Sequence, residues 1–133
     1  MKIILAALTL LAAISASAAH HGDVLTNKQG MTLYTFDKDA NGDSACYGGC
    51  AAKWPPYLAK ADAQIKGAWG LTERKDGAKQ WTYNNQPLYT WIGDSQKGDT
   101  TGNGVGGVWH TAEKMHKKAE KKAKKSNSGY GAY

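Results

Sequence analysis

The stretch LYTFDKD at residues 33–39 returns as LYTWIGD at residues 88–94, 55 positions further along the chain. The same spacing, without insertion or deletion, carries Trp54 onto Trp109. Repeated units of this size are usually supersecondary pieces that are too small to bury their own apolar faces, so the copies pack together. The sequence therefore predicts two related units that share one core.

Aromatic side chains alternate within each copy of this stretch. Tyr34 and Phe36 are two positions apart, and Tyr89 and Trp91 take the same places in the second copy. Alternate residues of a strand point to the same side, and aromatic residues favour half-buried strands and bury a large area. We expect these four rings and the two matched tryptophans to meet in a common interior.

An acidic residue follows each aromatic pair. Asp39 and Asp94 stand three positions after the second aromatic residue, where the chain should leave the sheet. An aspartate at such a place accepts hydrogen bonds from backbone amides and fixes a turn. The alternative is a pair of exposed carboxylates that bind a ligand. Turn formation explains both residues without a ligand, so we favour the structural role.

Strand and turn signals predict a mainly β fold, a small single domain over residues 19–112 with repeat units at about residues 25–57 and 80–112. The clearest hairpin has Asp-Gly at residues 76–77, a pair that favours the positive dihedral angles of a tight turn. A short helical turn is expected just before Pro55, because proline disfavours helix in the preceding residue. The expected strands are residues 24–26, 31–36, 69–74, 79–83, 87–91 and 108–111.

The first residues have the features of a cleaved N-terminal signal helix, and a signal peptide is predicted over residues 1–18. Lys2 supplies a positive start, residues 3–14 are mostly apolar, and residues 16–18 (Ala-Ser-Ala) resemble a cleavage site. The apolar run is too short for a membrane anchor, which needs about 20 residues. No cysteine near the cleavage site accepts a lipid. The mature chain is expected to be exported and soluble, either periplasmic or secreted.

The positive charge of the chain lies near its C-terminus. Residues 20–112 have nine basic and nine acidic residues, whereas residues 113–125 have seven lysines and two glutamates. This distribution argues against a basic groove for nucleic acid on the folded body. The tail, residues 113–133, is expected to be a marginal helix followed by a disordered end. It either holds the protein to an anionic envelope surface or is simply solvated.

Cys46 and Cys50 are separated by Tyr-Gly-Gly, whose glycines let the loop bend so that the two sulfurs meet. A structural disulfide is the default outside the cytoplasm. The alternatives are a redox dithiol and a pair of thiolates that bind Cu(I), the soft ion that thiolates favour. We favour the disulfide, although the spacing alone does not decide between them.

Histidines are the other candidate metal ligands. Cleavage after Ala18 leaves His21 third in the mature chain, where the free amine, two amides and the imidazole can surround Cu(II) in a square plane. Two solvated histidines, His20 and His21, at a chain end are the simpler interpretation. His110, beside Trp109, is a candidate ligand or acid/base group, but a partly buried, hydrogen-bonded histidine is commoner. No cofactor is predicted, and copper is the alternative.

Two further motifs accompany the doubled Y-x-[FW]-x-x-D pattern: CYGGCAAKWPP at residues 46–56 and GVGGVWH at residues 104–110. In this order they resemble the secreted-repeat family, predicted exported lipoproteins with a conserved Y-x-[FWY]-x-x-D motif. The resemblance covers about residues 25–112. It implies a small exported module and no particular reaction, because the function of that family is not established. The chain lacks the lipid-accepting cysteine of the family's lipoproteins.

No motif of enzymatic chemistry stands out in the sequence. It shows neither a nucleophile paired with a base nor a tuned pair of carboxylates. We therefore expect a non-enzymatic binding or envelope-associated module of unknown ligand, exported and periplasmic in the first instance. The alternative is a periplasmic copper-binding or thiol redox protein, with a site drawn from Cys46, Cys50, His20, His21 and His110.

Overall fold

The computed structural model describes residues 23–115. Short strands dominate this part of the chain, and they lie in two antiparallel sheets. The elements in order are β1 (Tyr34–Phe36), α1 (Gly49–Lys53), β2 (Trp69–Glu73), β3 (Lys79–Tyr83), β4 (Gln86–Pro87), η1 (Val105–Gly107, a 3-10 turn) and β5 (Trp109–Thr111). The predicted mainly β fold is therefore confirmed.

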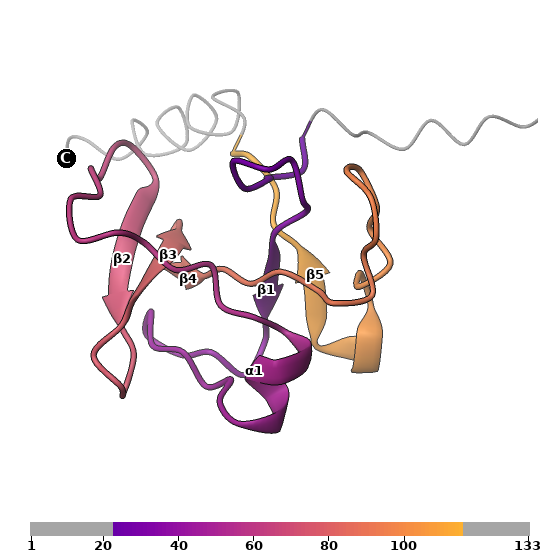
Figure 1. Cartoon of the computed structure of the whole chain (residues 1–133), viewed down its shortest axis with the longest axis horizontal. Helices are drawn as coiled ribbons and strands as arrows, with labels where there is room; N and C mark the ends of the chain where they lie inside the picture. The colour runs from indigo at the N-terminus through magenta and orange to yellow at the C-terminus, as the bar shows by residue number, and fades with distance from the viewer. Residues whose placement is uncertain (1–22, 116–133) are drawn as a thin grey trace, which may run out of the picture.

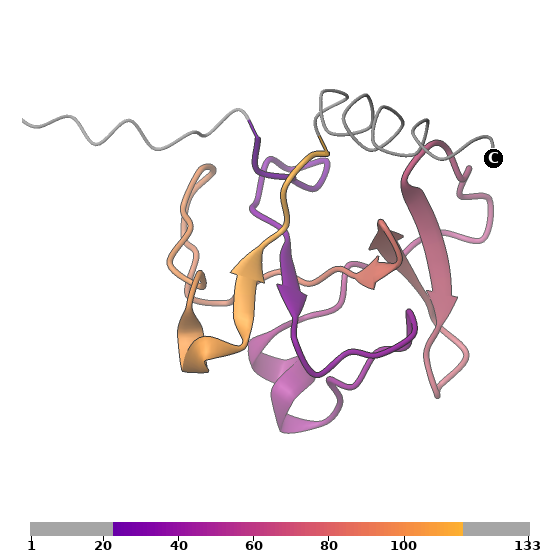
Figure 2. The same ribbon diagram turned by 180° about the vertical axis from the view of Figure 1, so that it is seen from behind.

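The two sheets lie on opposite sides of the body, with α1 beneath them (Figures 1 and 2). One sheet has the order β2-β3-β4, and the other pairs β1 with β5. The predicted hairpin is present as β2 and β3, with Trp69 opposite Tyr83 and Glu73 opposite Lys79. Asp76 and Gly77 form its turn, where Gly77 has the positive φ of 84° that glycine tolerates.

The tyrosine segments of the two copies lie side by side at the centre. Tyr34 and Tyr89 form an antiparallel bridge and exchange backbone hydrogen bonds of 2.8 and 3.0 Å. Tyr34 also pairs with Thr111 of the second copy, and Tyr89 pairs with Pro56 of the first. Each tyrosine segment thus lies between its counterpart and the end of the opposite copy. The two copies interlock rather than fold as separate lobes.

The turns before the two central tryptophans also fold alike. α1 opens with a hydrogen bond from the Cys50 amide to the Tyr47 carbonyl (3.1 Å), and η1 opens with the matched bond from Val105 to Gly102 (3.2 Å). The predicted short helix before the prolines is therefore present. The structure confirms two repeat units, because matched residues make matched backbone contacts.

The first expected hairpin is only partly formed. Thr26 and Thr32 make an isolated bridge instead of belonging to two continuous strands. The reason lies in Leu25, whose amide donates to the Ala112 carbonyl while its own carbonyl accepts from the Leu33 amide. Because Leu25 is shared between two neighbouring segments, the ladder between residues 24–26 and 31–33 cannot extend.

Two buried clusters form the core of the described residues. One is aromatic and lies between the copies, and the other is aliphatic and lies beside the hairpin. Each cluster contains matched residues from both copies, as expected for a shared core. The aromatic cluster contains Tyr34, Cys46, Trp54, Tyr89 and Trp109, and the aliphatic cluster contains Leu25, Leu33, Leu88 and Ala112.

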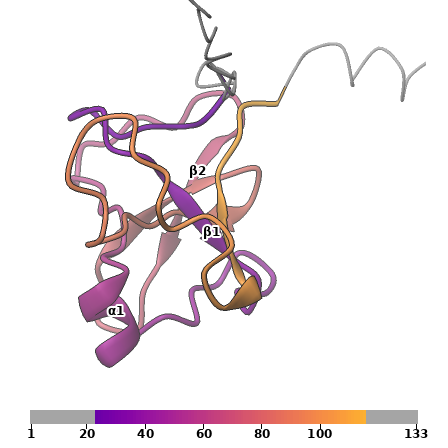
Figure 3. The same cartoon turned by 90° about the vertical axis from the view of Figure 1, so that its right-hand side faces the viewer.

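The chain enters and leaves the described body at the same end, opposite α1 (Figure 3). Lys114 donates its amide to the Asp23 carbonyl (2.7 Å), and the Met115 amide donates to the Tyr83 hydroxyl (3.1 Å). Residues 113–115, expected to begin a helical tail, are extended instead because they continue this pairing. The predicted signal peptide and the rest of the tail lie outside the described residues. In the range 23–115, no helix has the length and apolar character needed to cross a membrane.

Candidate functional site

The motif tyrosines and aspartates form hydrogen bonds across the two copies. The Tyr34 hydroxyl donates to Asp94 Oδ2 (2.6 Å), and the Tyr89 hydroxyl donates to Asp39 Oδ2 (2.9 Å). Each tyrosine therefore bonds the aspartate of the opposite copy. The sequence analysis identified all four residues but missed this exchange, because it assigned each aspartate to the turn of its own copy alone.

Each aspartate also holds the turn that follows it. Asp39 Oδ1 accepts the Ala45 amide (2.7 Å), and Asp94 Oδ1 accepts both the amide (3.0 Å) and the hydroxyl (2.6 Å) of Thr101. Both oxygens of each carboxylate are thus engaged within the domain. The structure places the two aspartates in the turn role that the sequence favours, rather than in an exposed pair of ligand-binding carboxylates.

Burial raises the pKa of the two motif tyrosines and of Asp39. It raises the pKa of the Tyr34 hydroxyl, and the hydrogen bond to Asp94 adds to that effect. It also raises the pKa of Tyr89, with a further contribution from the charge of Asp39. Both hydroxyls are therefore neutral donors. Burial likewise raises the pKa of Asp39, although its hydrogen bonds and the charge of Arg74 partly offset the increase.

A buried arginine joins the Asp39 side to the hairpin. Arg74, only 5% exposed, donates to Ser44 Oγ (2.8 Å), to Gln80 Oε1 (2.9 Å) and to the Cys46 carbonyl (2.8 Å). Ser44 Oγ lies 2.5 Å from the Tyr89 hydroxyl, so the network is continuous with the tyrosine–aspartate pair. A buried cation is tolerated only when its donors are satisfied. The sequence analysis did not single out Arg74, whose position on a hairpin gave no sign of burial.

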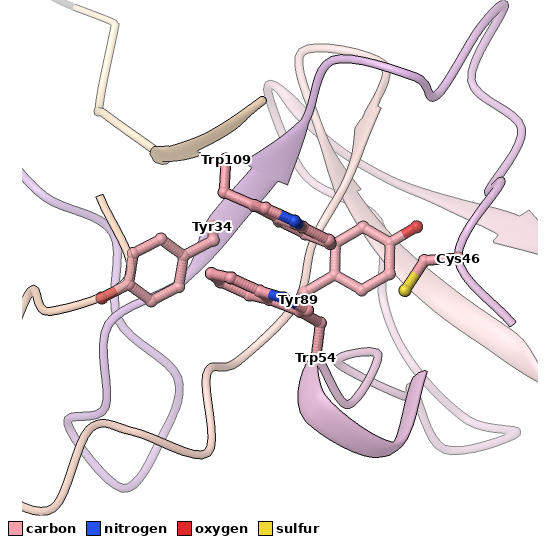
Figure 4. Packing of buried hydrophobic residues seen from close by; sticks show 5 residues of the cluster. All are labelled: Tyr34, Cys46, Trp54, Tyr89 and Trp109. Atoms are coloured by element: carbon pink, nitrogen blue, oxygen red, sulfur yellow. The ribbon is translucent and has the colours of Figure 1, made fainter. Parts of the chain in front are cut away.

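Four aromatic rings form a continuous stack through the core. Trp54 and Trp109 are parallel within 4°, with ring centroids 3.8 Å apart. Trp91 stacks on the outer face of Trp54 at 4.1 Å, and Phe36 stacks on the outer face of Trp109 at 4.2 Å. Figure 4 shows the two central rings face to face, with the tyrosines at their edges. All the aromatic residues of the repeated motif thus lie in the aromatic cluster or pack against it.

The cysteines are joined to each other. Cys46 and Cys50 form a disulfide with a Cα–Cα distance of 5.3 Å, and Cys46 is fully buried beside the aromatic core. The disulfide is the state that the sequence favours over a free dithiol. It ties the start of α1 to the segment that carries the Arg74 network.

His110 is exposed, rather than partly buried as expected. Its Nε2 lies 2.9 Å from Asp37 Oδ2, and both side chains are about half exposed. The side chains of β5 alternate, so His110 points outward while Trp109 points into the core. Between residues 23 and 115, no three or more His, Cys, Asp or Glu residues are grouped to hold a metal ion. His20 and His21 lie outside the described residues, and their copper site stays a prediction.

The β2–β3 hairpin has an unusual distribution of side chains. On one face, Gln80 and Thr82 are 0% and 4% exposed. On the other face, Trp69, Trp81 and Tyr83 pack against the aliphatic cluster, and Trp69 contacts each of the other two rings edge-on. Each ring keeps part of its surface exposed. The aromatic face thus covers the aliphatic cluster with part of each ring and leaves the rest of each ring at the surface, where a ligand can contact it.

An open groove of about 580 Å³ lies beside this aromatic face, and we call it the aromatic groove. Its volume is within the range of small-ligand sites. The sequence analysis missed it, because residues 57–68 form a connector without a motif. The groove is lined by the apolar residues Tyr57, Leu58, Ala63 and Trp81 and by the polar residues Lys28, Gln29, Lys60, Asp62 and Gln64.

Comparison with known proteins gives a family but no activity. A family model described as a secreted repeat of unknown function matches residues 15–57 and 70–113. The second match begins earlier than the predicted unit and so includes most of the hairpin. No curated protein and no solved structure matches the chain. Since the two matched ranges cover more than half of the sequence and coincide with the interlocked copies, the protein belongs to the family of secreted repeats of unknown function.

Proposed function

We propose that the protein is an exported, non-enzymatic binding module of the cell envelope, and that its ligand occupies the aromatic groove. The observation that carries this proposal is the hairpin with its polar face buried and its aromatic face part-exposed beside the groove. Arg74 holds the buried polar face of this hairpin through Gln80. On the other face, Tyr57 and Trp81 pack partly on the aliphatic cluster and also line the groove.

The difference between the motif residues and the groove residues supports the binding role. The two motif aspartates and their tyrosines are bonded to one another, with both tyrosines and Asp94 buried and Asp39 part-buried. The groove instead carries amides, ammonium groups and one carboxylate around aromatic rings. Such a set suits recognition, because it offers apolar contact and a few polar groups that fix orientation.

The lysine-rich tail supplies the envelope association in this proposal. Residues 113–125 have seven lysines and two glutamates, while the body from 20 to 112 is balanced in charge. A cluster of lysines is attracted to an anionic surface, and salt screens that attraction. Removal of residues 116–133 should therefore abolish salt-sensitive retention on anionic lipid vesicles without changing the occupancy of the groove.

The groove is tested by titrating the full-length mature chain and following the indole N–H signal of Trp81 by NMR. The probes are a neutral tetrasaccharide, an acidic tetrasaccharide, a basic and an acidic tetrapeptide, and glycerol phosphate. A saturable shift of the Trp81 signal with any one probe is the expected result, and calorimetry should show that the Trp81→Leu variant binds the same probe more weakly. The absence of such a shift with every probe would overturn the proposal.

A further inference from the structure

We infer that the ligand of the aromatic groove is a short acidic oligosaccharide, with carboxylate groups on its sugar rings. This inference rests on the proposed function and narrows it to one chemical class. The argument has three parts: the aromatic surface, the polar groups around it and the local charge.

Two aromatic rings provide surfaces suited to sugar rings. Tyr57 and Trp81 lie with centroids 6.4 Å apart and planes 30° from each other. Both pack partly against the aliphatic cluster, and the part-exposed remainder of each ring borders the groove. The electron-rich face of an aromatic ring attracts the slightly positive C–H groups of a pyranose face. Trp69 packs edge-on against Trp81 at 5.7 Å and so holds the indole in place before the ligand arrives.

The polar lining matches hydroxyl groups. Gln29 and Gln64 each offer a donor and an acceptor, and Asp62 offers an acceptor. A sugar hydroxyl both donates and accepts, so it needs partners of both kinds within a short distance. These side chains come from two separate segments, and a ligand of several rings can contact both.

The local charge selects an anionic sugar over a neutral one. Lys28 and Lys60 line the groove from different segments, against the single carboxylate of Asp62. The folded body as a whole has equal numbers of basic and acidic residues, so this excess is local. Ammonium groups form strong, charge-assisted hydrogen bonds with carboxylates.

The backbone beside the groove disfavours a peptide ligand. An extended peptide usually binds by adding a strand to a free sheet edge. Here the Ala59 amide donates to the Lys79 carbonyl (2.9 Å), and the Trp81 amide donates to the Tyr57 carbonyl (2.8 Å). The side of this segment that faces β3 is therefore already paired and cannot accept an added peptide strand.

The test compares a β-1,4-linked tetrasaccharide of glucuronate with its neutral glucose counterpart, using the full-length mature chain. We expect the glucuronate tetramer to bind about tenfold more tightly at low salt. Lys60→Gln should weaken its binding about threefold. Lys66→Gln is the matched control, since Lys66 is exposed on the same connector but does not line the groove. Trp81→Leu should weaken binding about tenfold, and Trp69→Leu should weaken it less.

The outcomes separate this inference from the proposed function. Equal affinity for the neutral tetramer, or equal effects of the two lysine substitutions, overturns the acidic-sugar inference and leaves the groove as a binding site. Binding of a tetrapeptide alone has the same consequence. If none of the probes shifts the Trp81 signal, both the inference and the proposed function are wrong.

Discussion

The two tyrosine–aspartate pairs contain the same motif residues, but their surroundings differ. Around Asp39, the side chains of Arg74 and Ser44 form a buried polar network that reaches into the hairpin. Around Asp94, the amide and hydroxyl of Thr101 complete the hydrogen bonds, and no cation from residues 23–115 pairs with this carboxylate. The tyrosine–aspartate motif therefore closes a turn without an arginine, and Arg74 is an addition to the surroundings of Asp39, which we call the first side.

The matched turns diverge in the same way. Gly102 lies so close to the core that an added Cβ would be 2.8 Å from the Trp54 ring and 2.9 Å from the Tyr34 ring. Its counterpart in the first copy is Tyr47, whose ring lies 4.2 Å from the Arg74 guanidinium. One turn closes on the core, and the other reaches out to the hairpin. The comparison teaches that repeated residues build the core, whereas unmatched residues attach the part that carries the groove.

The strongest test of the symmetry is the removal of either central ring. Trp54→Ala and Trp109→Ala should each destabilise the fold by about 4 kcal/mol, because each removes a buried indole stacked on both faces. Urea denaturation of the two variants measures the loss. Similar values support an equivalent role for the two copies, and a loss below about 1 kcal/mol in either variant contradicts it.

Removal of the buried Arg74 cation tests the difference between the two tyrosine–aspartate pairs. Arg74→Met should destabilise the protein by about 3 kcal/mol, because it leaves Gln80, the Cys46 carbonyl and Asp39 without their positive partner. The matched control is Lys75→Met, which changes an exposed neighbour. Denaturation midpoints compare the two variants. Equal midpoints would show that the network does not stabilise the first side.

The disulfide is a second difference between the copies. The matched positions of Cys46 and Cys50 are Thr101 and Val105, and the second turn closes without a covalent link. The double variant Cys46→Thr/Cys50→Val should therefore fold, with a loss of about 2 kcal/mol, because the closed loop is short. A variant that is unfolded by circular dichroism in the absence of denaturant would show that the first turn depends on its disulfide.

Asp39 should give the first side a distinct pH dependence. Its folded pKa is raised above the ordinary 3.8, so the folded state binds the proton more tightly than the unfolded state. The stability from protonated Asp39 is present below that value and is lost as pH rises through the folded pKa. The asparagine of the Asp39→Asn variant does not titrate. From about pH 3 upward, the free energy of unfolding of the parent should therefore fall relative to that of the variant. A difference that stays constant in urea denaturation across this range would contradict the prediction.

The smallest expected effect is at the surface pair of His110 and Asp37. Their matched positions are Pro55 and Ile92, so the second side has no such pair. His110→Gln should change the free energy of unfolding by about 0.5 kcal/mol or less, because exposed ion pairs contribute little. Denaturation at low and high salt measures it. A loss above about 1 kcal/mol would show that this contact helps to hold β5 in place.

Much of the fold could be predicted from local signals. The exact spacing of Trp54 and Trp109 predicted the repeat, Asp-Gly predicted the hairpin turn, and the glycines between Cys46 and Cys50 predicted that the sulfurs can meet. Each of these features depends on residues near one another in the chain or on a direct match between two segments. Such features are visible in a sequence pattern.

The cross-copy hydrogen bonds and the groove could not be predicted in this way. Tyr34 and Asp94 are 60 residues apart, and nothing local states which aspartate a tyrosine will meet. Arg74 stands on a hairpin where a charged residue ordinarily faces solvent, so its burial depends on packing between distant segments. The groove depends on a connector whose composition carries no strand or helix period. The cross-copy hydrogen bonds, the burial of Arg74 and the groove all depend on tertiary packing between distant segments.

The interlocking of the copies has a consequence for how such a chain is assembled. A cut in the connector at residues 60–66 yields two fragments, each with one tyrosine segment. Tyr34 of the first fragment pairs with Thr111 of the second, and Tyr89 of the second pairs with Pro56 of the first. The fragments should therefore reconstitute the body only when mixed, with a yield that depends on their concentration. Within the single chain the encounter of the two copies is intramolecular, so it does not depend on protein concentration.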